Sequence, residues 1–196
     1  MDLTLTEGLT QDSCKAVADA GILVASMLGD YETAYRLGKT AFSLIDRLKA
    51  EWQRPPVYFS FTYISHMRKH FNESLEYYDL SYRKGLEMGD MQHAMYALSH
   101  KFHLMFWTGT DLRDCERENG NAMAFLAESQ GFLQLKLSEI IMQAVRKFQT
   151  PLGDPAELEW SKTDAEFMDT FNKMKHMVLV VRFTQYNAFF HYLMGN

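Results

Sequence analysis

The sequence contains little glycine, proline and cysteine, and each shortage argues against a class of fold. Its 196 residues include 11 Gly and 4 Pro, too few for a protein built from many tight β-turns. The prolines stand in two groups, at 55–56 and at 151–155, so long stretches between them are free to form helices. Two cysteines, Cys14 and Cys115, are too few for a disulfide framework and are typical of a reducing cytosol.

An excess of positive charge and a long uninterrupted apolar run are also missing. The chain has 20 basic and 25 acidic residues, a net charge of −5, whereas binding to nucleic acid needs a basic surface. The N-terminus, at residues 1–4, has neither the basic region nor the apolar region of a signal peptide. The most apolar stretch, 177–194, contains polar side chains such as Arg182 and Asn187 that are costly in lipid. We therefore expect a cytoplasmic chain that binds no nucleic acid and does not insert into a membrane.

Apolar and small residues recur at helical spacing through most of the chain. In the clearest example, one face of an amphipathic helix is formed by Tyr31, Ala34, Tyr35, Gly38, Ala41, Phe42, Ile45 and Leu48. Residues 13–28 show a similar pattern, and Gly29-Asp30 between the two segments combines a C-terminal glycine with an N-cap. These signals predict a helical hairpin over residues 13–49.

The same unit recurs further along the chain. We predict hairpins at 57–88, 91–130 and 132–175, the last with a loop at 150–162, and an incomplete hairpin at 177–196. The fold expected from this pattern is all-α, with residues 1–196 forming a single helical-repeat domain. The ending Met194-Gly195-Asn196 is similar to the turn of the first hairpin, which predicts that the chain is a segment of a longer protein.

The second helices of the first three hairpins align with one another at steps of 40 and then 41 residues. Each starts with a large apolar residue and has small residues three and ten positions later. These sets are Tyr31, Ala34 and Ala41; Phe71, Ser74 and Ser81; and Leu112, Cys115 and Ala122. Small residues let a neighbouring helix approach closely, and we expect the large residue to pack against the adjacent hairpin. The pattern predicts a solenoid of stacked hairpins, with Cys115 as a packed core thiol.

The segment 29–34, Gly-Asp-Tyr-Glu-Thr-Ala, with Ala41 and Leu44 beyond it, resembles the second helix of a tetratricopeptide repeat. The repeat step here is longer than the family's usual length of about 34 residues, and the first helices lack the Trp-x-x-Leu-Gly-x-x-Tyr pattern. The resemblance implies a right-handed α-α superhelix whose first helices line a concave groove. The polar groove residues expected on those helices are His66, His100, His103, Lys136, Glu139 and Gln143.

Residues 34–41, 85–97 and 107–112 together resemble the helical-repeat region of large multidomain signalling proteins. Such proteins carry an AAA-type ATPase ahead of this region and often sensor and histidine-kinase, or serine/threonine-kinase, domains. The resemblance implies a non-catalytic protein-interaction or regulatory scaffold in signal transduction, two-component systems included. Its partners would be other domains of the same chain or another protein, with the ATPase and kinase chemistry elsewhere. The repeat region of a large transcriptional regulator is an alternative.

Motifs that carry chemistry are missing from the sequence. It contains no G-x-x-x-x-G-K-[ST], no G-x-G-x-x-G and no G-x-S-x-G. His93, His100 and His103 share one face of a predicted helix, so an all-α enzyme or metal-binding protein using that face is the competing hypothesis. A metal site also needs ligands from a facing helix and second-shell support, which the sequence does not locate. We predict a chain with no catalytic residue, no metal ligand and no cofactor.

Overall fold

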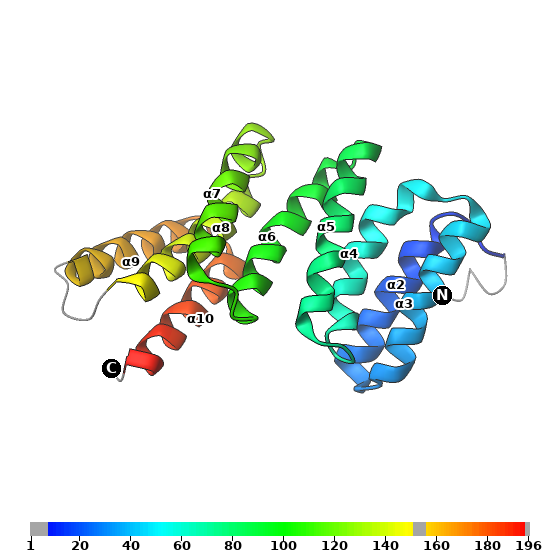
Figure 1. Ribbon diagram of the computed structural model, residues 1–196, viewed down its shortest axis with the longest axis horizontal. Helices are drawn as coiled ribbons and strands as arrows, with labels where there is room; N and C mark the ends of the chain where they lie inside the picture. The colour runs from blue at the N-terminus through cyan, green and yellow to red at the C-terminus, as the bar shows by residue number, and fades with distance from the viewer. Residues whose placement is uncertain (1–7, 151–155, 195–196) are drawn as a thin grey trace. The chain divides into compact units, whose positions relative to one another are not determined.

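A computed structural model describes residues 8–150 and 156–194, the side chains of 156–162 excepted. This part of the chain holds nine α-helices, a π-helical turn and a 3-10 turn, and it has no strand, which confirms the expected all-α class. The chain divides into two compact units, Met1–Leu104 and Met105–Asn196, and the division falls inside one helix, α6. Figure 1 labels the helices, and each unit is described by itself below.

The first compact unit is built from helices packed in adjacent pairs. Its elements are α2 (Ser13–Leu23), the π turn η1 (Val24–Leu28), α3 (Tyr31–Leu48), the 3-10 turn η2 (Glu51–Gln53), α4 (Arg54–Ser65), α5 (Phe71–Met88) and most of α6 (Met91–Trp107). α2 packs against α3 and α4 against α5, while α4 also contacts both α2 and α3 (Figure 1). The core of the unit therefore lies around α4, whose Val57, Phe61 and Ile64 are fully buried.

Local chemistry explains the turn between α2 and α3. Gly29 ends the first segment with a φ of 67°, in the left-handed region that glycine adopts without steric cost. Asp30 then caps α3 by accepting a hydrogen bond from the backbone N–H of Thr33 at 3.0 Å. Hydrogen bonding from the Thr33 side chain, and next from its backbone N–H, lowers the pKa of the Asp30 carboxyl group, since both stabilise the ionised form.

The start of α4 differs from the expected position. The helix begins at Arg54, and Pro55 and Pro56 lie in its first turn instead of in a loop before residue 57. Proline is accommodated there because the first N–H groups of a helix have no partner inside the helix.

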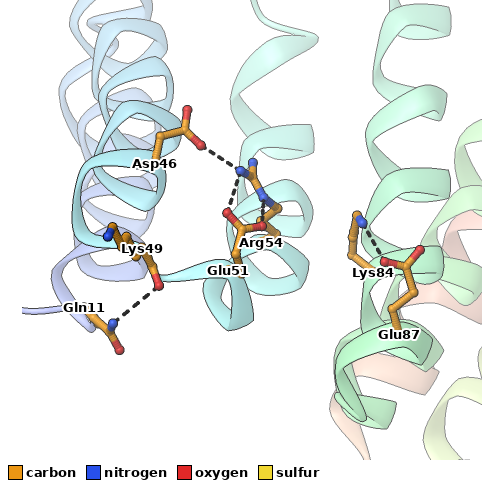
Figure 2. Close-up of polar contacts among 7 residues, drawn as sticks. All are labelled: Gln11, Asp46, Lys49, Glu51, Arg54, Lys84 and Glu87. Carbon is orange, nitrogen blue, oxygen red and sulfur yellow. Dashed lines mark hydrogen bonds and ion pairs between the residues drawn. The ribbon is translucent and has the colours of Figure 1, made fainter.

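Polar contacts anchor the start of α4, as Figure 2 shows. Arg54 donates hydrogen bonds to Asp46 on α3 at 2.7 Å and to Glu51 at 2.6 Å. The bond to Glu51 holds the pKa of the Glu51 carboxyl group below its usual value. Gln11 donates to the carbonyl oxygen of Lys49, the residue that follows α3, at 3.5 Å, and to that of Leu48 at 3.2 Å. The ion pair between Lys84 and Glu87 lies within α5. The chain between α3 and α4 is thus tied to α3 and to the segment that precedes α2.

The small residues of the repeat pattern are buried in the helix packing. They are Ala34, Ala41, Ser74, Ser81, Cys115 and Ala122. The two serines also bond to α4, because Ser74 shares a hydrogen bond with Ser65 at 2.6 Å and Ser81 donates to the Pro55 carbonyl oxygen at 2.8 Å. The large residues differ from the expectation, since Tyr31 and Phe71 are 48% and 45% exposed. Each is the first residue of its helix, where no preceding turn covers the ring.

The second compact unit contains the end of α6 and four further helices. These are α7 (Leu112–Glu128), α8 (Phe132–Gln149), α9 (Ala156–Lys173) and α10 (Met177–Met194). α8 packs against α7 and α10, and α10 also contacts α9. α9 begins at Ala156, inside the stretch 150–162 that was expected to be a loop, because Ala, Glu and Leu at its start are strong helix formers. Residues 151–155 and the last two of the hairpin expected at 177–196 lie outside the described residues.

No helix among the described residues is both long and apolar enough to span a lipid bilayer. The most apolar helix, α10, contributes Leu179 and Phe183 to the buried core of the second unit.

Candidate functional site

Five partly exposed rings from α4 and α6 gather on one surface of the first unit. We call this surface, formed by Phe59, Tyr63, His93, Tyr96 and His100, the aromatic–histidine face. Phe59 lies at its centre, with ring centroids 5.5 Å from Tyr63, 5.7 Å from Tyr96 and 5.2 Å from His100. The rings are tilted or edge-to-face, as favourable aromatic contacts are. Their partial exposure leaves an amphipathic surface available for a ligand.

Helical spacing places these rings together. Phe59 and Tyr63 are four residues apart on α4, and His93, Tyr96 and His100 follow at steps of three and four on α6, so each set occupies one side of its helix. The spacing of the α6 histidines predicted their shared side, but Phe59, Tyr63 and Tyr96 were not predicted to belong to the site. The i, i+4 spacing of Phe59 and Tyr63 is a signal that could have identified those two.

Hydrogen bonds orient the imidazole rings on this face. His93 lies with Nδ1 2.7 Å from the Asp90 carboxylate, which also accepts a bond from the His93 backbone N–H at 3.1 Å. His100 Nδ1 donates to the Tyr96 carbonyl oxygen at 2.9 Å, and Gln92 donates to the Tyr96 hydroxyl at 3.0 Å. These bonds restrict the rotamers of the side chains, so a ligand would meet a preorganised surface.

Two further expected groove residues belong to the same elements, His66 as the C-cap of α4 and His103 on α6. His66 donates from Nδ1 to the Thr62 carbonyl oxygen at 2.9 Å, and its ring stacks on Phe71 at a centroid distance of 5.1 Å. His103 follows His100 by one turn and is half-buried. The first unit therefore contains three of the six expected groove residues.

The remaining three expected groove residues lie on α8 in the second unit. Lys136 and Glu139 form an ion pair at 2.7 Å and border a shallow cavity of about 190 Å³ together with Phe167 and Phe171 of α9. Gln143 is buried and donates to Asp164 on α9 at 2.6 Å. It therefore contributes to the helix packing instead of an open groove surface, because α9 covers this part of α8.

A buried lysine, which no sequence pattern indicated, is the centre of a polar cluster in the second unit. The Lys147 side chain on α8 is 3% exposed. Its ammonium group donates to Asp164 on α9 at 2.6 Å and to Asn187 on α10 at 2.7 Å, and it lies 5.7 Å from the centroid of the Phe190 ring. In the sequence this residue is a lysine in the last turn of a helix, where a solvent-exposed cation is the usual arrangement. Its partners come from two other helices and are not adjacent in sequence.

Neither cysteine has the surroundings of a reactive thiol. Both are buried. Burial, reinforced by Asp114 and Glu118, raises the pKa of the Cys115 thiol to about 11, and burial also raises that of Cys14. The thiolate is the nucleophilic form, so both side chains are protonated packing groups near neutral pH.

The histidine side of α6 does not assemble a metal centre. Within the described residues no group of three His, Cys, Asp or Glu side chains could hold a metal ion. His93 is bonded to Asp90 and His100 to a backbone carbonyl oxygen, so the ligands of a metal site do not converge here.

Comparison of the chain with models of protein families, with curated proteins and with solved structures finds no match.

Proposed function

We propose that this chain is a non-catalytic protein-interaction segment that binds a partner protein on the aromatic–histidine face. In this proposal the helices form a tetratricopeptide-like, right-handed superhelix of hairpins, with the first helices α4 and α6 lining its concave side. The supporting observation is the cluster of partly exposed Phe, Tyr and His rings on these two helices. Aromatic residues are enriched at protein interfaces and at the positions that contribute most to binding.

The chemistry of the face favours a peptide with apolar side chains as the bound segment. Phe59 offers apolar ring surface at the centre, while the Tyr63 and Tyr96 hydroxyls and the imidazole edges supply hydrogen bonds around it. Tyr and Phe side chains lose little conformational entropy when they are immobilised. The net charge of −5 supports a protein partner over a nucleic acid.

The cellular setting is a further part of the proposal. Cytoplasmic location and a scaffolding role in a multidomain signalling protein are inferred from the resemblance of residues 34–41, 85–97 and 107–112 to the repeat region of such proteins. Partners would then be flanking domains of the same chain or a separate protein.

Peptide selection on the purified chain tests this function. We expect phage-displayed peptides selected on the wild-type protein to lose affinity more than about tenfold, by calorimetry, when Tyr63→Ala and Tyr96→Ala are combined, because interface tyrosines often contribute most of the binding energy. The matched control is Tyr192→Ala, which removes a tyrosine that is 80% exposed on α10. Circular dichroism verifies that each variant is folded.

Two results would contradict the proposal. Peptides that bind the double variant as well as the wild type would place the binding surface elsewhere. Stoichiometric zinc or iron in the purified protein would favour the competing hypothesis of a metal-binding protein.

A further inference from the structure

The second unit contains a pocket with largely aromatic walls. Its volume is about 490 Å³, within the range of roughly 300–1,000 Å³ for small-molecule sites. The walls come from Phe106 and Trp107 at the end of α6, Phe148 of α8, and Phe189 and Leu193 of α10, and the turn that leads into α7 contributes Asp111. The pocket is separate from the aromatic–histidine face, which belongs to the other unit.

The rings of the pocket are not stacked face to face. Phe106 and Trp107 are nearly perpendicular, at 88° with centroids 5.4 Å apart, and Trp107 and Phe189 are tilted by 53° at 4.8 Å. Trp107 also stacks on the buried Tyr186 at 5.7 Å, which holds its indole in place. These contacts fix the positions of the rings, and the rings that line the pocket are the type of group with which aromatic cages bind cations.

The electrostatics of the pocket favour positive charge. Among the described residues that line the pocket, Asp111 is the only ionisable one. Three of the helices that line the pocket do so through their last turns, since α6 ends at Trp107, α8 at Gln149 and α10 at Met194. The C-terminal end of a helix carries partial negative charge from its unpaired carbonyl groups, which stabilises nearby cations. Asp111 caps the positive end of α7 by accepting a bond from the Arg113 N–H at 2.8 Å, and its full negative charge exceeds the partial positive charge of about half a unit at that helix end.

We propose that this pocket binds an organic cation with apolar substituents, of which a quaternary ammonium group is the simplest. The ring faces would hold its methyl groups by cation–π contact, and Asp111 with the three helix ends would balance its charge. A free quaternary ammonium solute and a trimethylated lysine side chain share this group.

Two ligands of equal shape distinguish binding of a cation from binding of an uncharged apolar molecule. Choline and its uncharged isostere 3,3-dimethylbutan-1-ol are titrated into the full chain, and the Trp107 indole N–H resonance is followed by NMR. We expect choline to bind about fivefold more tightly than the isostere, since cation–π contacts are the difference between them. Equal or tighter binding of the isostere would overturn the proposal, as would no shift of the indole resonance by either ligand up to about 50 mM, which corresponds to a negligible affinity.

The variant Asp111→Asn removes the charge and keeps the helix cap, because Asn is as good an N-cap as Asp. We expect it to weaken choline binding several-fold and to leave binding of the isostere unchanged. Choline binding that does not change in this variant, or that survives Trp107→Leu, would also overturn the proposal. The source of the quaternary ammonium group is identified with a peptide that carries trimethyllysine, with the same peptide carrying unmodified lysine as its control. Tighter binding of the trimethylated peptide than of choline indicates a protein side chain as the ligand, and tighter binding of choline indicates a free solute.

Discussion

At the scale of single residues, two helical glycines differ in what surrounds them. A Cβ atom on Gly38 of α3 would lie 2.7 Å from Cε2 of Phe61 and closer still to Cδ2. Phe61 is fully buried, so its ring has no room to move away. A Cβ atom on Gly120 of α7 would meet only the flexible end of Met142, at an ordinary 3.7 Å. The first glycine is therefore required by packing, whereas the second is not.

We predict that Gly38→Ala lowers the free energy of unfolding by about 1–2 kcal/mol. The overpacking cost of about 1–3 kcal/mol exceeds the gain of about 1 kcal/mol in helix propensity. Gly120→Ala, the matched control, is expected to raise stability by about 0.5–1 kcal/mol. Urea unfolding followed by circular dichroism measures both. A Gly38→Ala protein as stable as the wild type would show that Phe61 is not closely packed against α3.

The Cys115 thiol makes the free energy of unfolding depend on pH in the alkaline range. Its pKa is raised to about 11 in the folded protein and is about 8.5 in an unfolded chain. The buried, protonated thiol therefore contributes its full stability below about pH 8.5, and this contribution is lost as the pH rises from there through about 11.

We predict that Cys115→Ala reduces the loss of stability between pH 8 and pH 10.5 by about 2 kcal/mol, since alanine does not titrate. Alanine occupies the equivalent position, Ala34, in the first repeat, so the variant is expected to fold. Urea titrations at both pH values give the difference. Parallel pH profiles for wild type and variant would mean that the thiol is accessible to solvent.

At the scale of helices, the Lys147 cluster joins three elements. The lysine belongs to α8, Asp164 to α9 and Asn187 to α10. Burying an ammonium group is costly, and the carboxylate and amide partners compensate this cost only while all are in place. Removing one partner is therefore expected to lower the free energy of unfolding more than replacing the pair with apolar side chains.

We predict that Lys147→Met costs about 3 kcal/mol of stability, because it leaves the Asp164 carboxylate, whose side chain is 22% exposed, without its cationic partner. The double variant Lys147→Met/Asp164→Leu is expected to regain most of this loss. The control is Lys173→Met, which breaks the ion pair to Asp169 on the surface of α9, where both side chains are exposed; an effect below about 0.5 kcal/mol is expected there. Equal losses for the two single lysine variants would refute a special role of the buried pair.

At the scale of the whole molecule, the chain consists of two compact units that divide within α6. Each unit is stabilised mainly by contacts within that unit. A substitution in one unit is therefore expected to change mainly the stability of that unit.

We predict that the effects of Gly38→Ala and Lys147→Met add within about 0.5 kcal/mol in the combined variant. Hydrogen exchange measured by mass spectrometry is expected to show faster exchange in α3 for the first variant and in α8 for the second. A coupling above about 1 kcal/mol, or loss of protection throughout the chain from either single change, would indicate one cooperative unit.

Much of the local structure could be predicted from the sequence, because it depends on neighbours in the chain. The Gly29-Asp30 turn has the left-handed glycine and the capping aspartate that its residues indicate. The start of α4 was misplaced, since Pro55 and Pro56 can begin a helix as well as interrupt one. The all-α class follows from spacing alone, whereas the superhelical arrangement stays a prediction.

The sequence by itself determined that the chain is helical and where several of its helices begin and end, since capping, propensity and apolar spacing act over a few residues. Only the tertiary structure decided which side chains meet across helices. His100 was recognised from its spacing, but its contact with Phe59 required α4 and α6 to pack. Lys147 has the sequence context of a solvent-exposed lysine and is buried because α9 and α10 cover α8 with matching polar groups. Burial and pairing are long-range properties, and the contacts that set them are 17 and 40 residues apart in the chain.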